Sequence, residues 1–143
     1  MKKKIAILGS TGSIGKTLIN ILKKDKKNIE IILLVANRNV NELLKQAKFF
    51  NVKNLIITNK NKFLKTKKKL INKNIKIYNS FGSFEKIFKN KNLDYTMSAI
   101  SGLEGLSPTF KIIKFTKKIA IANKESIICA WPLIKKELNR YKT

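Results

Sequence analysis

The 143-residue sequence has no histidine and only one cysteine, Cys129. The absence of histidine removes the commonest general base and the commonest metal ligand found in proteins. A single cysteine excludes an internal disulfide framework and any cysteine-cluster metal site. Because Cys129 lies in an apolar stretch, we expect it to be a small buried hydrophobic residue and not a nucleophile.

Long apolar segments are also absent. The longest uninterrupted apolar run, Ile31–Ala36, is far shorter than the ~20 residues that a membrane-spanning helix needs. Residues 1–4 lead directly into a strand-like run, without a segment typical of a secretory or transit leader. We therefore expect a soluble cytoplasmic protein without a membrane partner.

Acidic residues are scarce, with 8 against 32 basic residues and a formal net charge of +24. Only Arg38 and Arg140 are arginines, and the other basic residues are lysines. A+T-rich coding would produce this lysine excess without selection for charge, whereas surfaces that bind nucleic-acid phosphates usually recruit arginine as well. Since no known nucleic-acid-binding motif accompanies the charge, we expect no specific nucleic-acid partner. A basic nucleic-acid-binding protein remains the alternative function.

The sequence does contain a regular alternation of short apolar runs and helix-like stretches. The predicted strands are residues 4–8, 29–36, 55–57, 75–78, 95–100 and 118–122. The predicted helices are residues 13–24, 41–50 and 60–74, two helices capped by Ser83 and Ser107, and residues 124–140. This alternation predicts a single α/β domain, residues 1–143, with a mostly parallel sheet covered by helices on both faces.

Two of the predicted helices have specific features. Ile14, Leu18, Ile21 and Leu22 form the apolar stripe expected to face the core from the first helix. In the last helix, Pro132 removes a backbone donor and is predicted to kink or restart the helix.

The strongest local motif is Gly9-Ser-Thr-Gly-Ser-Ile-Gly15, which joins the first predicted strand to the first predicted helix. Glycines in such a turn allow the backbone to approach a ligand closely, so that N–H groups at the helix N-terminus can bind a pyrophosphate. A purely structural turn of small residues is the alternative interpretation.

A second candidate segment, residues 37–39, follows the second predicted strand. NAD-binding units carry an acidic residue at this point for the ribose 2′-hydroxyl, and this sequence has none. Arg38 would pair with a 2′-phosphate, which favours NADP over NAD. The alternative is a solvated charge in a lysine-rich loop.

A third segment, Asn123-Lys-Glu-Ser126, follows the last predicted strand, and ligands bind at the carboxyl ends of strands in open α/β sheets. Lysine there can hold a phosphate or carbonyl oxygen, and Asn123 and Glu125 can orient a nicotinamide or ribose. The alternative is a helix N-cap at Asn123, with Glu125 interacting with the helix dipole.

Four motifs occur in order: Gly9-Ser-Thr-Gly-Ser-Ile-Gly15, Val35-Ala-Asn-Arg-Asn39, Ala99-Ile-Ser-Gly-Leu-Glu-Gly-Leu-Ser-Pro-Thr109 and Ala120-Ile-Ala-Asn-Lys-Glu-Ser126. Together they resemble the N-terminal domain of the 1-deoxy-D-xylulose 5-phosphate reductoisomerases over essentially the whole chain. The resemblance implies a Rossmann-like, doubly wound α/β fold. It also implies an NADP-dependent oxidoreductase and isomerase of the non-mevalonate isoprenoid route, which converts 1-deoxy-D-xylulose 5-phosphate into 2-C-methyl-D-erythritol 4-phosphate with NADPH and Mg²⁺, Mn²⁺ or Co²⁺.

The resemblance also assigns roles to residues of the three segments. The pyrophosphate of the cofactor would contact Thr11, Gly12, Ser13 and Ile14. The adenosine half with its 2′-phosphate would contact Asn37, Arg38 and Asn39. The nicotinamide half would contact Asn123 and Glu125, and the substrate would contact Lys124.

Three departures from the family pattern qualify the resemblance. The helix after Gly15 lacks one residue that the family usually has. Trp131 stands where the family tends to have glycine, and its larger side chain is predicted to overfill the local packing. The metal ligands of the family are expected beyond Thr143, so we expect no catalytic or metal-binding residue within this chain. The chain alone is therefore expected to be inactive, either as a fragment or as a decayed gene product. Family members are homodimers, whereas we expect a monomer or weak self-association for this chain.

Overall fold

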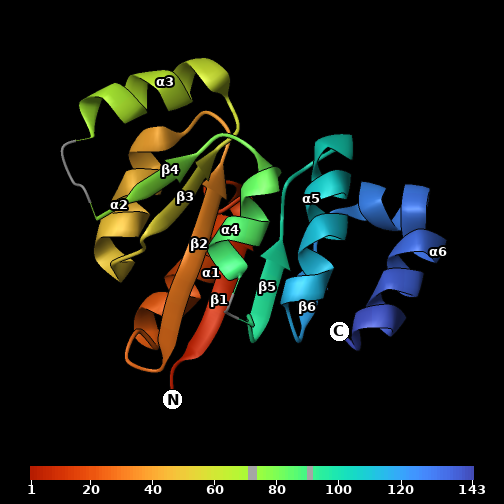
Figure 1. Ribbon diagram of the computed structural model, residues 1–143. Helices are drawn as coiled ribbons and strands as arrows, with labels where there is room; N and C mark the ends of the chain where they lie inside the picture. Colours follow the sequence, from red (N-terminus) through yellow and green to blue (C-terminus); the bar gives the residue numbers. More distant parts are fainter. Residues whose placement is uncertain (71–73, 90–91) are drawn as a thin grey trace.

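The computed structural model describes residues 1–70, 74–89 and 92–143, and its centre is a six-stranded sheet. The strand order is β4-β3-β2-β1-β5-β6, and every pair of neighbouring strands is parallel (Figure 1). The strands are β1 Lys3–Leu8, β2 Ile29–Ala36, β3 Asn54–Ile57, β4 Lys76–Tyr78, β5 Tyr95–Ser98 and β6 Ile119–Ile121. The predicted parallel α/β class is confirmed, and β1 lies between β2 and β5.

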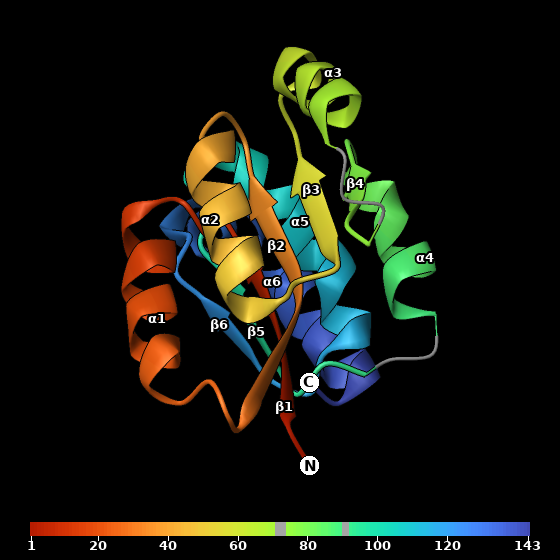
Figure 2. The ribbon, with the colours of Figure 1, turned by 90° about the vertical axis from the view of Figure 1, so that its left-hand side faces the viewer.

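Helices cover both faces of the sheet. Figure 2 shows α1 and α2 on one side of the strands and α4 on the other. The helices are α1 Ser13–Lys24, α2 Val40–Phe50, α3 Lys60–Lys69, α4 Phe84–Phe88, α5 Leu106–Ile112 and α6 Lys124–Tyr141. The third helix is shorter than predicted and ends at Lys69, while residues 71–73 of that prediction lie outside the described residues.

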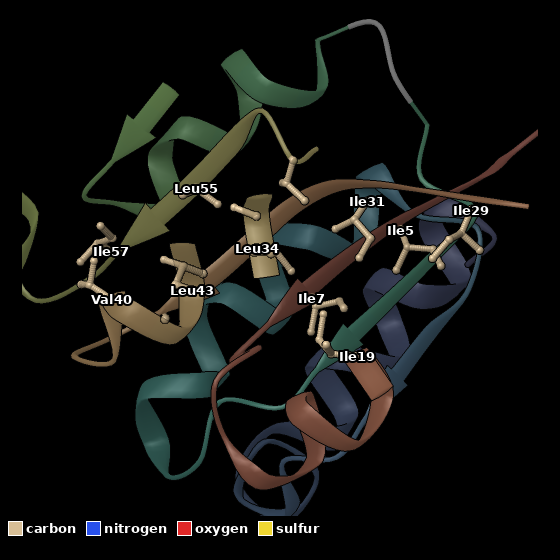
Figure 3. Close-up of a cluster of buried hydrophobic side chains, with 13 residues drawn as sticks. Ile5, Ile7, Ile19, Ile29, Ile31, Leu34, Val40, Leu43, Leu55 and Ile57 are labelled. Atoms are coloured by element: carbon tan, nitrogen blue, oxygen red, sulfur yellow. The ribbon is translucent and has the colours of Figure 1, made fainter. Parts of the chain in front are cut away.

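Two apolar cores lie on opposite faces of the sheet. The first packs α1 and α2 on the strands through buried residues that include Ile19, Leu43 and Ala47 (Figure 3). The second packs α4 and α5 on the other face and includes Phe84 and Ile112. Because both faces are covered, the central strands are apolar at nearly every position, as in buried parallel sheets.

The pairing of β2 with β1 contains a register shift that the sequence pattern did not predict. Ile5 pairs with Ile31, but the next residue, Ala6, pairs with Leu33, so Ile32 is an extra residue in the ladder. As a result Ile32 and Leu33 both pack into the core beside α4. An extra residue of this kind reverses the alternation of side chains along the strand beyond it.

Several local sequence predictions are wrong. Ser83 is at the predicted N-cap position of α4, but its hydroxyl donates to the Ser80 carbonyl in the preceding 3₁₀ turn and makes no capping hydrogen bond. Ser107 lies inside α5, because a preceding 3₁₀ turn, Leu103–Gly105, already directs the chain into that helix. Both errors arise because a 3₁₀ turn leads directly into the α-helix without a separate side-chain cap.

The buried face of α1 also differs from the predicted stripe. Ile19 and Gly15 are buried, Leu18 and Leu22 are partly buried, and Ile14 is exposed. Ile21, also predicted to face the core, is 59% exposed. The helix is nevertheless regular from Ser13 to Lys24, so the missing residue after Gly15 does not interrupt it.

The last helix, α6, bends in its first half. Ala130 has non-helical angles, φ −143° and ψ 21°, two residues before Pro132, so the predicted kink is confirmed. Cys129 is exposed, which contradicts the prediction that it is buried. Trp131 is 42% exposed and therefore does not overfill the interior. No helix among the described residues is long and apolar enough to span a membrane.

Candidate functional site

A cavity of about 830 Å³ opens at the carboxyl edge of the sheet. Its walls come from the segments that follow β1, β2, β3 and β5, because the carboxyl ends of parallel strands meet at one edge. Four of the predicted cofactor residues line it: Thr11, Gly12, Asn37 and Arg38.

The glycine motif forms the floor of this cavity, and two glycines are needed for its shape. Gly9 has a φ of +83°, and a Cβ there would lie 2.6 Å from the carbonyl oxygen of Ala99. Gly15 packs the start of α1 onto the loop, and a Cβ there would overlap the carbonyl oxygen of Gly9. Any larger side chain at either position would push the loop away from the helix or from β5.

The N-terminus of α1 has the features of a helix end that can attract an anion. Gly12 is its N-cap, no side chain caps it, and its first turn contains no acidic residue. The first amides of a helix have no partners within the helix, and together with the helix dipole they attract phosphate groups. Thr11 and Gly12, which precede these amides, line the cavity.

Arg38 also lines the cavity, from the exposed turn between β2 and α2. Asn39 follows it and caps α2, since its side-chain oxygen accepts from the Glu42 N–H at 3.3 Å. Asn39 does not line the cavity, and its observed contact is with the helix. Its predicted contact with the adenosine half stays a prediction.

Several cavity residues were not singled out as ligand contacts from the sequence. They are Thr58, Asn59, Lys60, Phe81, Ser101 and Glu104. Thr58, Asn59 and Lys60 directly follow β3, so the rule that ligands bind at the carboxyl ends of strands could have indicated them. Lys60 adds a second cation to the wall that holds Arg38, whereas Glu104 supplies a negative charge from the segment after β5.

Asn123 fulfils the capping role that the sequence left open. Its oxygen accepts from the Ser126 N–H at 2.6 Å, so it is the N-cap of α6, and it is only 2% exposed. Its amide nitrogen donates to the carbonyls of Ile100 and Gly102, the latter at 2.7 Å. The side chain therefore fixes the turn after β5, of which Ile100 lines the cavity.

The remaining predicted residues lie outside the cavity walls. Lys124 is exposed and Glu125 partly exposed in the first turn of α6. Ser13 and Ile14 instead line a small apolar hollow beside Met97. Direct contacts of these residues with cofactor or substrate stay predictions.

The described residues also show whether side chains that could bind a metal ion lie together. Among residues 1–70, 74–89 and 92–143, no group of three or more acidic, cysteine or histidine side chains is placed to hold a metal ion. The described residues therefore offer no such group of ligands to a divalent metal ion. Their glycines and the N-terminus of α1 instead fit the phosphates of a dinucleotide.

The parallel sheet, its covering helices and the glycine loop at its carboxyl edge define a Rossmann-like α/β protein. A model of the family "1-deoxy-D-xylulose 5-phosphate reductoisomerase" matches residues 5–131. The chain belongs to this family.

Relatives of known sequence agree with this assignment. A 1-deoxy-D-xylulose 5-phosphate reductoisomerase of Pelagibacter ubique is 61% identical over 142 residues, which are 99% of this chain and 37% of the relative. One from Phocaeicola vulgatus is 37% identical over 143 residues. The chain thus spans a little over a third of the length of the curated relatives it matches.

Solved structures show the same fold. The reductoisomerase of Zymomonas mobilis in complex with NADPH is similar with a TM-score of 0.89 and 29% identity. The match covers 100% of this chain and 38% of that one. A second reductoisomerase, in complex with NADPH, fosmidomycin and magnesium, gives a TM-score of 0.87 at 27% identity, covering 97% of this chain and 34% of that one.

Proposed function

We propose that residues 1–143 are the NADPH-binding domain of a 1-deoxy-D-xylulose 5-phosphate reductoisomerase. The whole enzyme would rearrange and reduce 1-deoxy-D-xylulose 5-phosphate to 2-C-methyl-D-erythritol 4-phosphate in isoprenoid biosynthesis. Family membership over residues 5–131 supports the activity, and the named NADPH complexes support the cofactor. A homodimeric assembly and a cytoplasmic location belong to the same proposal.

One observation carries the cofactor assignment. The cavity is lined by Thr11 and Gly12, which lead into the uncapped N-terminus of α1, and by Arg38 and Lys60 from the segments after β2 and β3. Two separate phosphate-binding features match a dinucleotide that carries a pyrophosphate and a 2′-phosphate. Arg38 follows the strand at which NAD-specific proteins place a carboxylate for the ribose hydroxyl, so the charge at this point favours the phosphorylated cofactor.

The residues would divide the binding of NADPH among them. Thr11 and Gly12 lead into the α1 N-terminus, where the pyrophosphate would bind, and Arg38 would form charge-assisted hydrogen bonds to the 2′-phosphate. The nicotinamide half would then extend toward the turn after β5 that Asn123 fixes.

The proposed position of NADPH also suggests which residues would lie near the reacting groups. NADPH supplies the hydride when it is bound. Lys124 and Glu125 lie at the start of α6, next to Asn123, and would approach the substrate and the nicotinamide half, respectively. The divalent metal of the family is expected to take its ligands from outside these residues.

The experiment is a calorimetric titration of the chain with NADPH and NADH at 0.3 M salt. One charge-assisted contact contributes roughly 1.5–3 kcal/mol, so we expect NADPH to bind about 10- to 150-fold more tightly than NADH. Arg38→Ala should remove most of this preference. High salt matters because the net charge of +24 attracts the extra phosphate at long range, and that attraction is screened.

The matched control removes charge away from the cavity. Lys65 lies on α3 outside the cavity walls, so Lys65→Ala should leave the ratio of the NADPH and NADH affinities unchanged. Equal affinities for NADH and NADPH in the unmodified chain at 0.3 M salt would show that Arg38 is only a solvated charge.

A further inference from the structure

Gln46 is a buried polar residue on a face of α2 that is otherwise apolar. It is 3% exposed and lies next to Ala47 and one turn after Leu43, both of which pack into the core. Burying a side-chain amide costs free energy unless it is hydrogen-bonded, and an apolar side chain would fill this position at lower cost. The amide nitrogen of Gln46 has two hydrogen-bond acceptors, whereas its Oε1 is buried without a hydrogen-bond partner among the described residues, so the contacts of the nitrogen account for the polar side chain here.

The amide nitrogen of Gln46 reaches the glycine loop. It donates to the carbonyl oxygen of Ser10 at 3.1 Å and to the Glu42 carboxylate at 3.1 Å. Ser10 is fully buried, and its own N–H donates to the carbonyl of Val35 at 2.9 Å. The loop is therefore held on one side by β2 and on the other side by α2.

The hydrogen bond from Gln46 fixes the orientation of one peptide group. In a planar trans peptide the carbonyl of one residue and the N–H of the next point in opposite directions. Because the carbonyl of Ser10 points toward α2, the N–H of Thr11 points away from it. Thr11 lines the cavity.

We propose that Gln46 is a positioning residue that keeps the Ser10–Thr11 peptide oriented for pyrophosphate binding. Without this donor the peptide can rotate and turn the Ser10 carbonyl oxygen toward the anion, which replaces an attractive dipole by a repulsive one. The inference rests on the proposed function, since it concerns how the same cavity binds the phosphates of NADPH.

Gln46 also connects the two segments that are proposed to bind phosphates, which are the two ends of the proposed dinucleotide site. Glu42, its second acceptor, donates its backbone N–H to the side chain of Asn39, which directly follows Arg38. One hydrogen-bonded path thus runs from the 2′-phosphate end, through α2, to the glycine loop. The two ends can still be tested separately, because adenosine 2′-monophosphate carries the 2′-phosphate and no pyrophosphate.

The test is Gln46→Met, which keeps the length of an unbranched side chain and removes the donor. Binding of NADPH and of adenosine 2′-monophosphate is measured by calorimetry at 0.3 M salt. We expect NADPH affinity to fall about 10-fold or more, the equivalent of one hydrogen bond to a charged group, with less than about a twofold change for the monophosphate. Equal losses for both ligands, or no loss for NADPH, would overturn the proposal.

Leu43→Ala is the matched control on the same face of α2. It removes a fully buried side chain of the core, and it should lower the melting temperature without changing the ratio of the two affinities. If Leu43→Ala changes the ratio of the NADPH and adenosine 2′-monophosphate affinities as much as Gln46→Met does, the effect of Gln46→Met is due to general destabilisation.

A measurement on the unmodified chain covers the case in which Gln46→Met does not fold. The amide resonance of Thr11 should shift on adding NADPH and stay in place on adding adenosine 2′-monophosphate. If NADPH shifts the resonances around Arg38 and leaves Thr11 unmoved, the proposal is wrong while the proposed function stands. If NADPH shifts neither region, the proposed function itself fails.

Discussion

The amino-terminal region, residues 1–57, and the carboxyl-terminal region, residues 103–143, are stabilised in different ways. The first is held by a core of thirteen buried residues between the sheet and its helices. In the second, α6 packs on the neighbouring segments through a cluster of only three: Ile113, Ala130 and Ile134. Apolar side chains of α6 are exposed instead, with Ile128 at 77% and Leu133 at 60%.

This contrast has a consequence for the site. The turn that holds Arg38 lies between Ala36 and Val40 of the larger core, and the glycine loop is held by hydrogen bonds of Ser10 to Val35 and Gln46. The segment that begins at Asn123 depends mainly on the hydrogen bonds of that side chain to Ile100, Gly102 and Ser126. We infer that the glycine loop and the Arg38 turn are more rigid than the segment that begins at Asn123.

The largest effect is expected from the small cluster under α6. Ile134 is fully buried, so Ile134→Ala should lower the free energy of unfolding by about 2–5 kcal/mol, whereas Leu133→Ala should change it by less than about 0.5 kcal/mol. Urea denaturation measures both. NADPH affinity should survive Ile134→Ala under folding conditions, because the phosphate-binding loop lies in the other region. Equal losses from the two substitutions would remove the distinction between the buried and exposed faces of α6.

A smaller effect on stability is expected in the glycine loop. In Gly15→Ala the new methyl group overlaps the Gly9 carbonyl oxygen, and the cost of about 1–3 kcal/mol should exceed the gain in helix propensity. NADPH binding should weaken at the same time, because the loop must move. The comparison is Gly12→Ala, whose Cβ would lie 3.5 Å from the same oxygen, an ordinary contact. If both variants are equally stable, the close approach of α1 to the loop is not a constraint.

The smallest effect concerns the junction of the two regions. Asp94 accepts from the backbone N–H of Lys4 at 2.9 Å and from the Lys117 ammonium at 2.9 Å, so it ties β1 to the segment before β6. The hydrogen bond from Lys4 and then that from Lys117 lower the pKa of Asp94 from 3.8 to about 2. The carboxylate is thus favoured in the folded state, and its contribution is fully present above pH 4 and lost as the pH falls to about 2.

Asp94→Asn tests this junction. The unfolding midpoint of the unmodified chain in urea should decrease more steeply between pH 4 and pH 2 than that of the variant. Lys117→Gln removes only the second contact and should keep the greater part of the pH dependence. If Asp94→Asn and the unmodified chain follow parallel curves, Asp94 makes no pH-dependent contribution.

Sequence patterns predicted the elements well wherever a local signal was strong. The apolar run of β2 and the twelve residues of α1 were placed correctly from first to last residue. The position of Ser83 as N-cap of α4 was correct but its side chain makes no capping hydrogen bond, and Ser107 lies inside α5, because a serine side chain is also compatible with the inside of a 3₁₀ or α-helical turn. Cys129 was misplaced because the first half of α6 buries Ser126 and Ala130, while the apolar residues between them, Ile127–Cys129, are exposed.

The candidate site was predictable where backbone chemistry determines it. The two segments singled out from the sequence contribute Thr11, Gly12, Asn37 and Arg38 to one cavity, whereas Ser13, Ile14 and Asn39 of the same segments do not line it. Their contacts with a cofactor stay predictions. Lys60 and Gln46 were missed, since neither belongs to a local motif. Lys60 comes close to the Arg38 turn because β3 pairs with β2. Gln46 on α2 reaches the glycine loop through its hydrogen bond to the Ser10 carbonyl.

By itself the sequence determined the order of strands and helices, the glycine turn and the charge near the second strand, because these depend on neighbouring residues. Only the tertiary structure decided the strand order in space, the extra residue Ile32 in β2, and the burial of Gln46 against Ser10. These features join residues far apart in the chain. Their free energy comes from packing and hydrogen bonds that exist only once the sheet and both helix layers are assembled.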